Sequence, residues 1–513
     1  MPAPNAKEQK QTLSTFSPFP LNVLRQRKKL IEEALKPCSR FRSSLSWDEL
    51  VDFKMAGLLD RLDFLGRDAL VPTEGVPLNW RILLNYLHSH GVTDSKHFSF
   101  IPSRTDMPKT FSVRLSPRSD ASDTDGRSVG RHGFGSTSSP EESLSRAIGE
   151  ILERYFLTIY RRADLYCASY VGIIQRKKTA LNIFKLNNFL PWQKEMFPVF
   201  VRTDDRSVMW VRGRELLADI EVFMPAQLAY WNYKFLDGEM ALAQPTTNGG
   251  AGHFTREEAI LSSLLENIQR DGFLIYWLNS LSPKIIDPST IVDKEIKQFL
   301  KYLRRYELEY YFLNTTTDIG VPSCACVLVD HRGGEPIIAV GGSAGFSFKE
   351  LVFQSAGEAL AVYNMVASSE RYVLPESYIP FTDPTIGRDQ RLCLWKGTEM
   401  YKRFKFFISG TRQSFEGFMG DATWHNTPSA QIAYILRKLR ELGDGYEVYC
   451  YEANHKVLKT LGYHVVKTIV PRLMHLYLNE NRATLDAPRL HDVPVRLGHR
   501  PAEIFNPWPH PFP

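Results

Sequence analysis

Three stretches of the chain share one arrangement of glycine, hydroxyl and carboxylate side chains. Each has a glycine-bearing loop, then a Ser or Thr, a Glu three residues later, and a second Glu eight residues after the first. The members are Ser139, Glu142 and Glu150; Thr255, Glu258 and Glu266; and Ser347, Glu350 and Glu358. Glycine-bearing loops at helix starts suit phosphate oxygens, and paired carboxylates suit Mg²⁺. The pattern therefore indicates binding of a Mg²⁺–nucleotide complex.

The spacing of the hydroxyl and the first glutamate is that of a capping box, which satisfies free N–H groups at a helix start. It predicts helices that begin at Ser139, Thr255 and Ser347, with Pro140 at a first position that needs no donor. Eight residues turn a helix by about 800°, so the two glutamates of each helix lie within about 80° of each other. The apolar residues fall on other faces, so a row of solvated carboxylates remains the alternative.

The three helices differ in the residue one turn beyond the second glutamate. Glu150 has Glu153 three residues later, Glu266 has Gln269, and Glu358 has Ala361. Residues three apart share a helix face, so a carboxylate pair is expected only on the first helix. The glycine spacing matches neither a Walker A loop nor a dinucleotide-binding fingerprint.

Helical and strand-like segments alternate beyond residue 140, which predicts a mixed α/β (α+β) fold. Buried strands are predicted at 326–329 and 337–340, with further strands at 446–450 and 464–470. Residues 21–100 are predicted to be mostly helical, with Ser46 and Glu49 at capping-box spacing. The Ser-, Asp-, Arg- and Gly-rich stretch 103–140 is predicted to be a functional loop.

Composition narrows the class of protein. The 513 residues are 43% hydrophobic and 23% charged, a globular balance with room for two or three modules. A net charge of +6, without a basic block interleaved with aromatics, does not indicate a nucleic-acid partner. There is no secretory signal and no run of about 18 apolar residues, so we expect no membrane partner. The scattered cysteines predict buried thiols in a reducing cytoplasm.

Several of these stretches resemble the signatures of YcaO-domain proteins. The first signature, Glu-x-x-Glu-Arg, is matched within residues 147–155, AIGEILERY. The second is matched by residues 247–271, TNGGAGHFTREEAILSSLLENIQRD. Residues 317–322, 341–343, 358–359 and 466–490 resemble more distal parts of the family. The resemblance covers about residues 105–513 and implies a YcaO-like core whose capped helices converge on an ATP pocket.

The resemblance also implies roles for individual residues. By position, the metal ligands would be Glu150, Glu153, Glu266 and Glu358, which would hold Mg²⁺ and the phosphates of ATP. Arg270 would contact phosphate and Asn248 would lie in the nucleotide pocket. Gln269 stands where some members have a glutamate, so one ligand would be neutral here.

The activity implied by the resemblance is ATP-dependent cyclodehydration of a ribosomally made precursor peptide. A Cys, Ser or Thr side chain attacks the preceding carbonyl, ATP phosphorylates the resulting oxygen, and loss of phosphate leaves a thiazoline or oxazoline. Two alternatives stay open at this point. One is thioamide or amidine formation on a peptide by the same kind of domain, and the other is a peptide-binding scaffold that does not turn over ATP.

Residues 507–513 alternate proline with Trp508, His510 and Phe512, and this Pro-x-Pro-x-Pro ending resembles that of azoline-forming cyclodehydratases. Proline fixes φ and removes a donor, so this tail is already extended and loses little entropy on docking. We expect Pro509, Pro511 and Pro513 to assist cyclisation. The Pro513 α-carboxylate, or the order that the prolines impose, would then aid proton transfer.

The expected organisation is an N-terminal helical region, 1–105, followed by an ATP-binding cyclodehydratase domain, 106–513. The resemblance implies a ThiF-like partner that binds the leader of the precursor peptide, and we expect it to be a separate chain docked by residues 1–105. An FMN-dependent azoline dehydrogenase is a further candidate partner, and the chain is expected to work in a homo- or hetero-oligomer.

Overall fold

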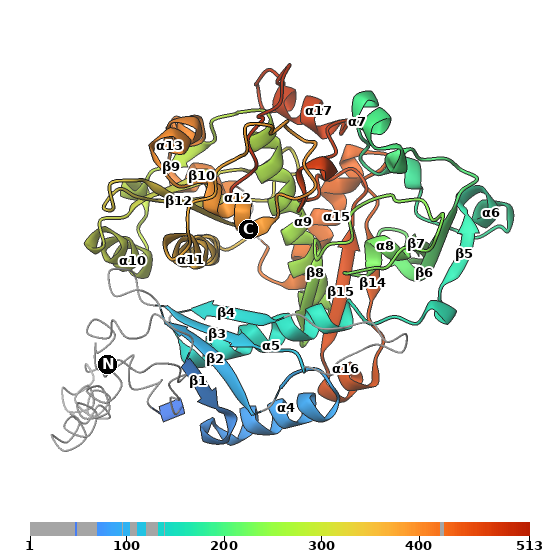
Figure 1. The fold of residues 1–513 in the computed structure, drawn as a ribbon, viewed down its shortest axis with the longest axis horizontal. Coiled ribbons are helices and arrows are strands. Elements are labelled where there is room, and N and C mark those ends of the chain that lie inside the picture. Colours follow the sequence, from blue (N-terminus) through green and yellow to red (C-terminus); the bar gives the residue numbers. More distant parts are fainter. Residues whose placement is uncertain are drawn as a thin grey trace, which may run out of the picture.

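Three β-sheets, with helices packed between and around them, make up the described part of the chain (Figure 1). The computed structural model describes residues 47–48, 69–94, 96–102, 110–118, 132–137, 139–420 and 425–513. The mixed α+β fold predicted from the sequence is confirmed.

Each sheet has its own strand order. The first sheet is β1 (Ala69–Pro72), β2 (His97–Pro102), β3 (Phe111–Leu115) and β4 (Gly133–Thr137). The second is β12 (Ile337–Ala344), β11 (Ser323–Asp330), β10 (Glu309–Asn314), β9 (Lys284–Ile286) and β13 (Arg412–Gln413). The third is β5 (Tyr166–Ser169), β6 (Ser207–Glu215), β14 (Tyr449–Glu452), β15 (His464–Ile469) and β8 (Gly250–His253), with β7 (Ile220–Pro225) beside β6. Neighbouring strands are antiparallel except β9 and β13, which are parallel.

The helices vary from one turn to 23 residues. The longer ones are α4 (Leu78–Ser89), α5 (Pro140–Phe156), α9 (Arg256–Leu278), α10 (Lys294–Arg305), α11 (Phe348–Ala367), α15 (Pro428–Leu442) and α17 (Arg489–Arg496). The shorter ones are α6 (Tyr170–Gln175), α7 (Pro191–Met196), α8 (Ala226–Ala229), α12 (Arg388–Leu394), α13 (Thr398–Phe404), α14 (Phe415–Met419) and α16 (Lys456–Leu461).

The first sheet crosses the boundary predicted at residue 105, because β2 pairs with β3. Residues 69–102 contain one α-helix, α4, between two strands, so the prediction of a mostly helical region is wrong for this part. Alternate residues of β2, Phe98 and Phe100, point into the core, which favours a strand. The stretch 103–140 is not a continuous loop, since β3 and β4 lie within it. The predicted cap at Ser46 and Glu49 lies outside the described residues.

Three strand–helix units form a ring in the middle of the fold. They are β4 with α5, β8 with α9, and β12 with α11. Each helix packs on its own strand and also contacts the strand of another unit: α5 contacts β8, α9 contacts β12, and α11 contacts β4. The sequence repeat therefore corresponds to a cyclic arrangement in space, with the three helices facing a shared centre.

Glycine allows each strand to lie close against its helix. A Cβ atom on Gly135 in β4 would lie 2.0 Å from the carbonyl oxygen of Ser143 in α5. A Cβ atom on Gly341 in β12 would lie 2.4 Å from the carbonyl oxygen of Ser355 in α11. Because a real Cβ could not approach so closely, any larger residue would push the helix away from the strand. The glycines thus set the depth at which the helices sit.

The second sheet separates two hydrophobic cores. On β11, Ala325, Val327 and Val329 belong to the core that includes α9, while Cys324, Cys326 and Leu328 belong to the core that includes α10 and α11. This two-sided burial explains an unbroken apolar run. The strands predicted around 326–329, 337–340 and 464–470 are confirmed, and the strand predicted at 446–450 begins later, at Tyr449.

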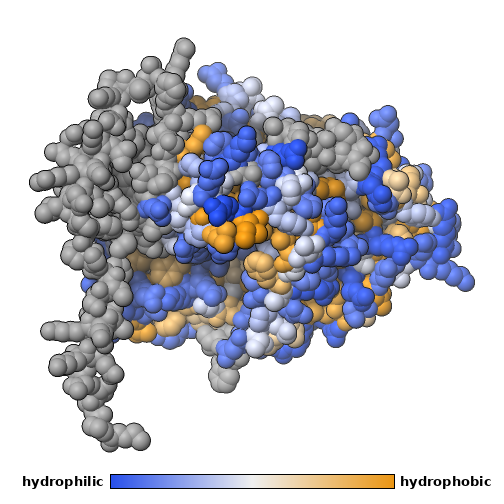
Figure 2. Space-filling model, turned by 90° about the horizontal axis from the view of Figure 1, so that it is seen from below, coloured by the Kyte–Doolittle hydropathy of each residue, from blue (hydrophilic) through white to orange (hydrophobic). Residues whose placement is uncertain are grey.

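The surface shown in Figure 2 is mainly hydrophilic, with hydrophobic residues in separate groups. Leu78 and Ile82, one turn apart on α4, are each 60% exposed. Groups of this kind are common on folded domains. Among the described residues, no helix has both the length and the apolar character that a membrane span requires.

Candidate active site

The three central helices begin where the sequence predicts, at Pro140, Arg256 and Phe348. The caps are only partly as predicted. Thr255 Oγ1 accepts from the Glu258 amide at 3.2 Å and Ser347 Oγ from the Glu350 amide at 3.4 Å. The Ser139 side chain makes no cap hydrogen bond, and Thr137 Oγ1 binds the Ser139 backbone N–H and C=O.

Two of the first glutamates serve other partners. Glu142 pairs with Arg146 at 2.8 Å. Glu258 Oε2 lies 2.6 Å from His253 Nδ1 and also accepts from the Thr255 hydroxyl at 2.6 Å. These two side chains therefore do not complete the capping box, in which the glutamate accepts from the backbone N–H of the cap residue. Their position in the first turn still favours the helix start, since negative charge is stabilised at a helix N-terminus.

The second glutamate of each helix accepts a backbone hydrogen bond from the strand of its own unit. Glu150 Oε2 accepts from the Phe134 amide of β4. Glu266 Oε2 accepts from the Gly249 amide, just before β8, at 2.9 Å, and Glu358 Oε2 from the Gly342 amide of β12 at 2.7 Å. The alternative of fully solvated carboxylates is wrong for these three side chains, because the strands of the ring cover that face of each helix.

Two of the three carboxylates have an arginine four residues later. Arg154 Nη2 lies 2.6 Å from Glu150 Oε1. Arg270 donates through Nε at 2.8 Å and Nη2 at 2.5 Å to Glu266 Oε1. These charge-assisted hydrogen bonds fix the carboxylates in one orientation. The predicted phosphate contact, Arg270, thus lies beside a predicted metal ligand.

Burial and mutual repulsion raise the pKa of the carboxylates. Burial, followed by the charges of Glu266 and Glu150, raises the pKa of Glu153 to about 8. Burial, opposed mainly by the Gly342 amide and Arg270, raises the pKa of Glu358 to about 7. The pKa of Glu150 is also raised by burial, against the opposing charge of Arg154. Such a set of repelling carboxylates favours a bound cation.

A buried lysine of β15 joins the carboxylates, although the sequence reading missed it. Lys467 lies opposite Gly250 of β8 and donates to the carbonyl of Thr246. Burial lowers its pKa to about 8, while Glu266 and Glu153 act in the opposite direction. The only signal in the sequence is a lysine among the apolar residues of a predicted strand, which is weak evidence by itself.

Asn248 and Gln269 are buried beside the carboxylates. The Asn248 side chain donates through Nδ2 to the carbonyl of Leu476 at 2.7 Å, and so ties the loop before β8 to the distal part of the chain. Gln269 Nε2 is buried without a hydrogen-bond partner within the described structure. Gln269 therefore has a free donor to offer to an acceptor at the site.

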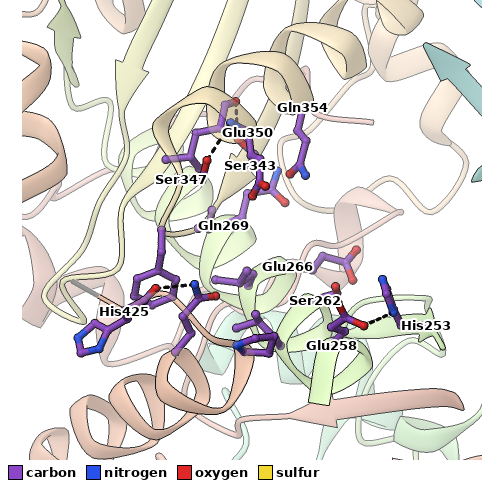
Figure 3. A pocket seen from close by; sticks show the side chains of 18 of the residues that line it. His253, Glu258, Ser262, Glu266, Gln269, Ser343, Ser347, Glu350, Gln354 and His425 are labelled. Atoms are coloured by element: carbon purple, nitrogen blue, oxygen red, sulfur yellow. Dashed lines mark hydrogen bonds and ion pairs between the residues drawn. The ribbon is translucent and has the colours of Figure 1, made fainter. Parts of the chain in front are cut away.

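A cavity of about 640 Å³ lies between the N-terminal halves of α9 and α11. Figure 3 shows Glu266 and Gln269 on one side and Ser343 and Gln354 on another. The segment that starts at His425 closes a further side. The volume suits a small organic ligand, and the lining places one predicted metal ligand at its edge.

The tail lies close to one wall of this cavity, because Phe512 packs beside Gly342, which lines it. Figure 1 shows the C-terminal end inside the molecule, and residues 509–512 are buried. The Phe512 ring lies 4.7 Å from that of Phe273, and the Arg270 guanidinium lies 5.9 Å from its centroid. A Cβ atom on Gly342 would lie 2.9 Å from Phe512. Pro509 and Pro511 are buried and Pro513 is half-buried, and their catalytic role stays a prediction.

The family model described as YcaO cyclodehydratase, ATP- and Mg²⁺-binding, matches residues 134–474, which is more than half of the chain. The matched region contains the whole ring of carboxylates. The chain belongs to this family. Because this family is described as binding ATP and Mg²⁺, these are the two ligands that the site is expected to fit.

Several YcaO-related proteins can be compared with this chain. An uncharacterised protein of Methanothermobacter thermautotrophicus is 31% identical over 138 residues, 26% of this chain and 36% of that protein. A heterocyclase in complex with substrate and cofactor has a TM-score of 0.62 at 19% identity, covering 79% of this chain and 53% of its own. A YcaO protein of Methanopyrus kandleri bound with AMPPCP and Mg²⁺ has a TM-score of 0.53 at 16% identity, covering 79% of this chain and 93% of its own.

These structural likenesses show the fold. The match spans about a third of the curated Methanothermobacter protein and about half of the heterocyclase chain.

The donor set fits Mg²⁺ when phosphates complete the coordination. Within the described ranges, no group of three or more His, Cys, Asp or Glu side chains could hold a metal ion by itself. Mg²⁺ is usually bound by one or two carboxylates together with water and substrate phosphates. The four predicted glutamates interact with one another electrostatically and lie near Arg270 and Lys467, so they would offer oxygen ligands to the metal and positive charges to phosphate.

Proposed function

We propose that this YcaO protein catalyses ATP-dependent cyclodehydration of Cys, Ser or Thr residues in a precursor peptide. One observation carries the proposal. The tail packs through Phe512 against Arg270 and Gly342, and these two residues hold Glu266 and Glu358. The tail and two predicted metal ligands thus share their contacts, which supports a role for the tail in the chemistry of that site.

In this proposal Glu150, Glu153, Glu266 and Glu358 hold Mg²⁺, and Arg270 contacts phosphate. Asn248 and Gln269 line the nucleotide pocket, where Gln269 offers its free amide donor. Mg²⁺–ATP, when bound, supplies the phosphoryl group that turns the former amide oxygen into a good leaving group. The proline tail orders the peptide-facing side of the pocket and excludes water, since residues 509–512 leave little space there.

Each ring formed removes the amide oxygen as phosphate. The side-chain sulfur or oxygen loses its proton as it forms a bond to the preceding carbonyl carbon, and the amide nitrogen loses its proton as the C=N bond forms. The oxygen leaves with the phosphoryl group, so one ATP becomes ADP and phosphate. In this proposal the tail assists the proton transfer, through the Pro513 α-carboxylate or through the order that the prolines impose.

The partners in this proposal are a precursor peptide and a ThiF-like protein that holds the peptide leader. An FMN-dependent dehydrogenase would act later, if the rings are oxidised. Residues 1–105 are proposed to dock the ThiF-like protein. Co-elution of the two proteins should then be lost when residues 1–100 are deleted.

The direct test combines the purified chain, its ThiF-like protein, the precursor peptide and ATP. We expect loss of one water per ring by mass spectrometry, matched by one phosphate released. Gain of sulfur when sulfide is added would instead indicate thioamide formation. ATP hydrolysis without any change in peptide mass, with or without sulfide, would refute the proposal.

A scaffold without turnover makes a different prediction. Replacing Glu150 and Glu266 by Gln would leave the activity of the assembly unchanged. The Glu142→Gln variant is the matched control, since Glu142 lies on α5 and pairs with the exposed Arg146.

A further inference from the structure

Three consecutive carbonyl groups of the tail each accept a hydrogen bond from an aromatic side chain. Tyr378 donates to Pro507 O at 2.9 Å. Trp277 of α9 donates through Nε1 to Trp508 O at 3.1 Å, and Trp395, at the end of α12, donates to Pro509 O at 3.0 Å. The three donors come from separate parts of the chain and are placed together only by the fold.

The alternating prolines dictate the shape that these donors meet. Proline fixes φ near −65°, and a residue before proline is driven away from the helical region. Trp508, His510 and Phe512 each precede a proline, so the whole tail is held in extended, polyproline-II-like backbone. Such a backbone makes no internal hydrogen bonds, and its carbonyl oxygens remain free to accept from a partner.

The tail also lies against aromatic and cationic side chains. The Arg403 guanidinium lies 4.2 Å from the centroid of the Trp508 ring. Trp277 and Trp395 pack edge to face at 5.1 Å, and both are fully buried. Aromatic-lined grooves with donors aimed at carbonyls are the general means by which proteins bind proline-rich peptides.

Arg391 of α12 distinguishes His510 from the other positions of the tail. Its Nη1 lies 2.6 Å from the carbonyl of Tyr477 and 3.1 Å from His510 Nε2. Nε2 also lies 3.1 Å from the carbonyl oxygen of Tyr477, so this ring nitrogen sits between a donor and an acceptor. His510 therefore places a polar ring nitrogen between Arg391 and the Tyr477 carbonyl, which a phenylalanine at that position could not imitate.

We propose that Trp277, Tyr378, Arg391, Trp395 and Arg403 form a receptor groove for a proline-alternating peptide in the polyproline II conformation. The groove holds residues 505–513 as a separable ligand. The contacts to His510 fix which residue of the tail occupies each position in the groove. This inference goes beyond the proposed function, because it concerns binding and holds whatever reaction the site performs.

The connection between the tail and the rest of the chain is exposed, which makes the separation testable. Residues 498–500 and 503–504 are exposed, and Ile504 is 85% exposed. Helix α17, before this connection, is anchored independently. Arg489 bonds Asp271 at 2.6 Å and Asp318 at 2.9 Å. Helix α17 and the tail therefore each have their own contacts to the rest of the fold.

The experiment inserts a protease recognition sequence at His499 in the full chain and cuts the folded protein. We expect the C-terminal fragment to remain bound during size-exclusion chromatography, as detected by mass spectrometry. Release of the fragment while the remainder keeps its circular dichroism spectrum would overturn the proposal.

Exchange with labelled peptides tests the register. A synthetic peptide of residues 505–513 should displace the fragment. A His510→Phe peptide should be weaker by about ten- to a hundredfold, which is the loss expected for a hydrogen bond to a charged group. A His510→Gln peptide, which keeps an acceptor, should recover part of the affinity. Equal displacement by a peptide of scrambled sequence would overturn the proposal.

A matched pair of tryptophan variants tests the groove. Trp395→Phe removes one indole donor from the groove, and in the cut protein it should speed release of the fragment by about tenfold or less, the value of one neutral hydrogen bond. Trp210→Phe removes a buried indole that donates to Ala168 O at 2.9 Å in another core, and should leave release unchanged. Equal release from both variants, or no effect of Trp395→Phe, would contradict the groove.

Discussion

The three strand–helix units of the ring hold their glutamates alike but supply positive charge differently. Units β4–α5 and β8–α9 each place an arginine one turn after the glutamate, Arg154 and Arg270. Unit β12–α11 has the buried Val362 at that position. The positive charge that lowers the pKa of Glu358 is instead that of Arg270 from α9. One arginine thus serves two units and also contacts Phe512 of the tail.

The units also differ one residue earlier. Glu153 of α5 forms a carboxylate pair with Glu150, whereas Gln269 of α9 offers an unpartnered amide and Ala361 of α11 offers nothing polar. The ring is therefore threefold in backbone and asymmetric in charge. The negative charge is concentrated on α5, and the cation that serves two units lies on α9. Three sets of substitutions test whether this asymmetry matters, and a fourth tests the packing of the ring.

The largest effect is expected from Glu266→Gln. The charge of Glu266 raises the pKa of both Glu153 and Glu358, so Glu266 lies between the other units. Loss of this charge should lower peptide-dependent ATP turnover by about a hundredfold or more, the range for removal of one group that stabilises transition-state charge. Phosphate release measures the effect, and Glu142→Gln is the control. Turnover like that of the unchanged protein would remove Glu266 from the site.

Arg270→Met should have a larger effect than Arg154→Met. Both break an ion pair with a glutamate one turn away, but only Arg270 also acts on Glu358 and Phe512. We expect Arg270→Met to weaken nucleotide binding by about ten- to a hundredfold, as for hydrogen bonds to charged groups, with Arg154→Met several-fold weaker in effect. Calorimetry with a non-hydrolysable ATP analogue measures both. Equal losses would mean that Arg270 does not serve two units.

Gln269→Glu would make the second unit resemble the first. A further carboxylate in this buried cluster should lower the melting temperature without ligand by about 2 °C, as expected for roughly 1 kcal/mol. Added Mg²⁺ with the ATP analogue should then stabilise the variant more than the unchanged chain. Thermal unfolding with and without ligand gives both values. A variant that is destabilised equally in both conditions would argue against a cation near Gln269.

The smallest effect concerns two glycines, one on helix α11 and one on strand β12, which α11 covers. A Cβ on Gly357 of α11 meets nothing within 4 Å, so Gly357→Ala should stabilise the chain by about 0.5–1 kcal/mol through its helix propensity. Gly341→Ala, on the strand beneath, should destabilise, because its Cβ would lie 2.4 Å from Ser355 O. Urea unfolding compares the two. Stabilisation by both would show that the strand does not need its glycine.

The three helix starts and the register of the glutamates were predictable from the amino-acid sequence alone. These features depend on local physics: a Ser or Thr before Arg256 and Phe348, Pro140 at a first position, and a fixed rotation per residue. The strands around 326–329 and 337–340 were also predictable, since burial on both faces leaves an apolar run. The predicted cap was wrong at Ser139, whose side chain makes no cap hydrogen bond although its backbone is bound by the Thr137 hydroxyl.

The buried faces of the helices, and the distant groups that reach them, depend on the tertiary structure. The carboxylates lie off the apolar stripes, so the hydrophobic periodicity alone predicts that they are solvated, as surface glutamates usually are. The pairing of β15 with β8 carries Lys467 to Glu153 and Glu266, from more than 200 residues away. Arg391 and the aromatic donors of the tail groove are likewise brought together only by the fold. Local rules act over a few residues, whereas these contacts depend on the closure of the ring and on the path of the tail through it.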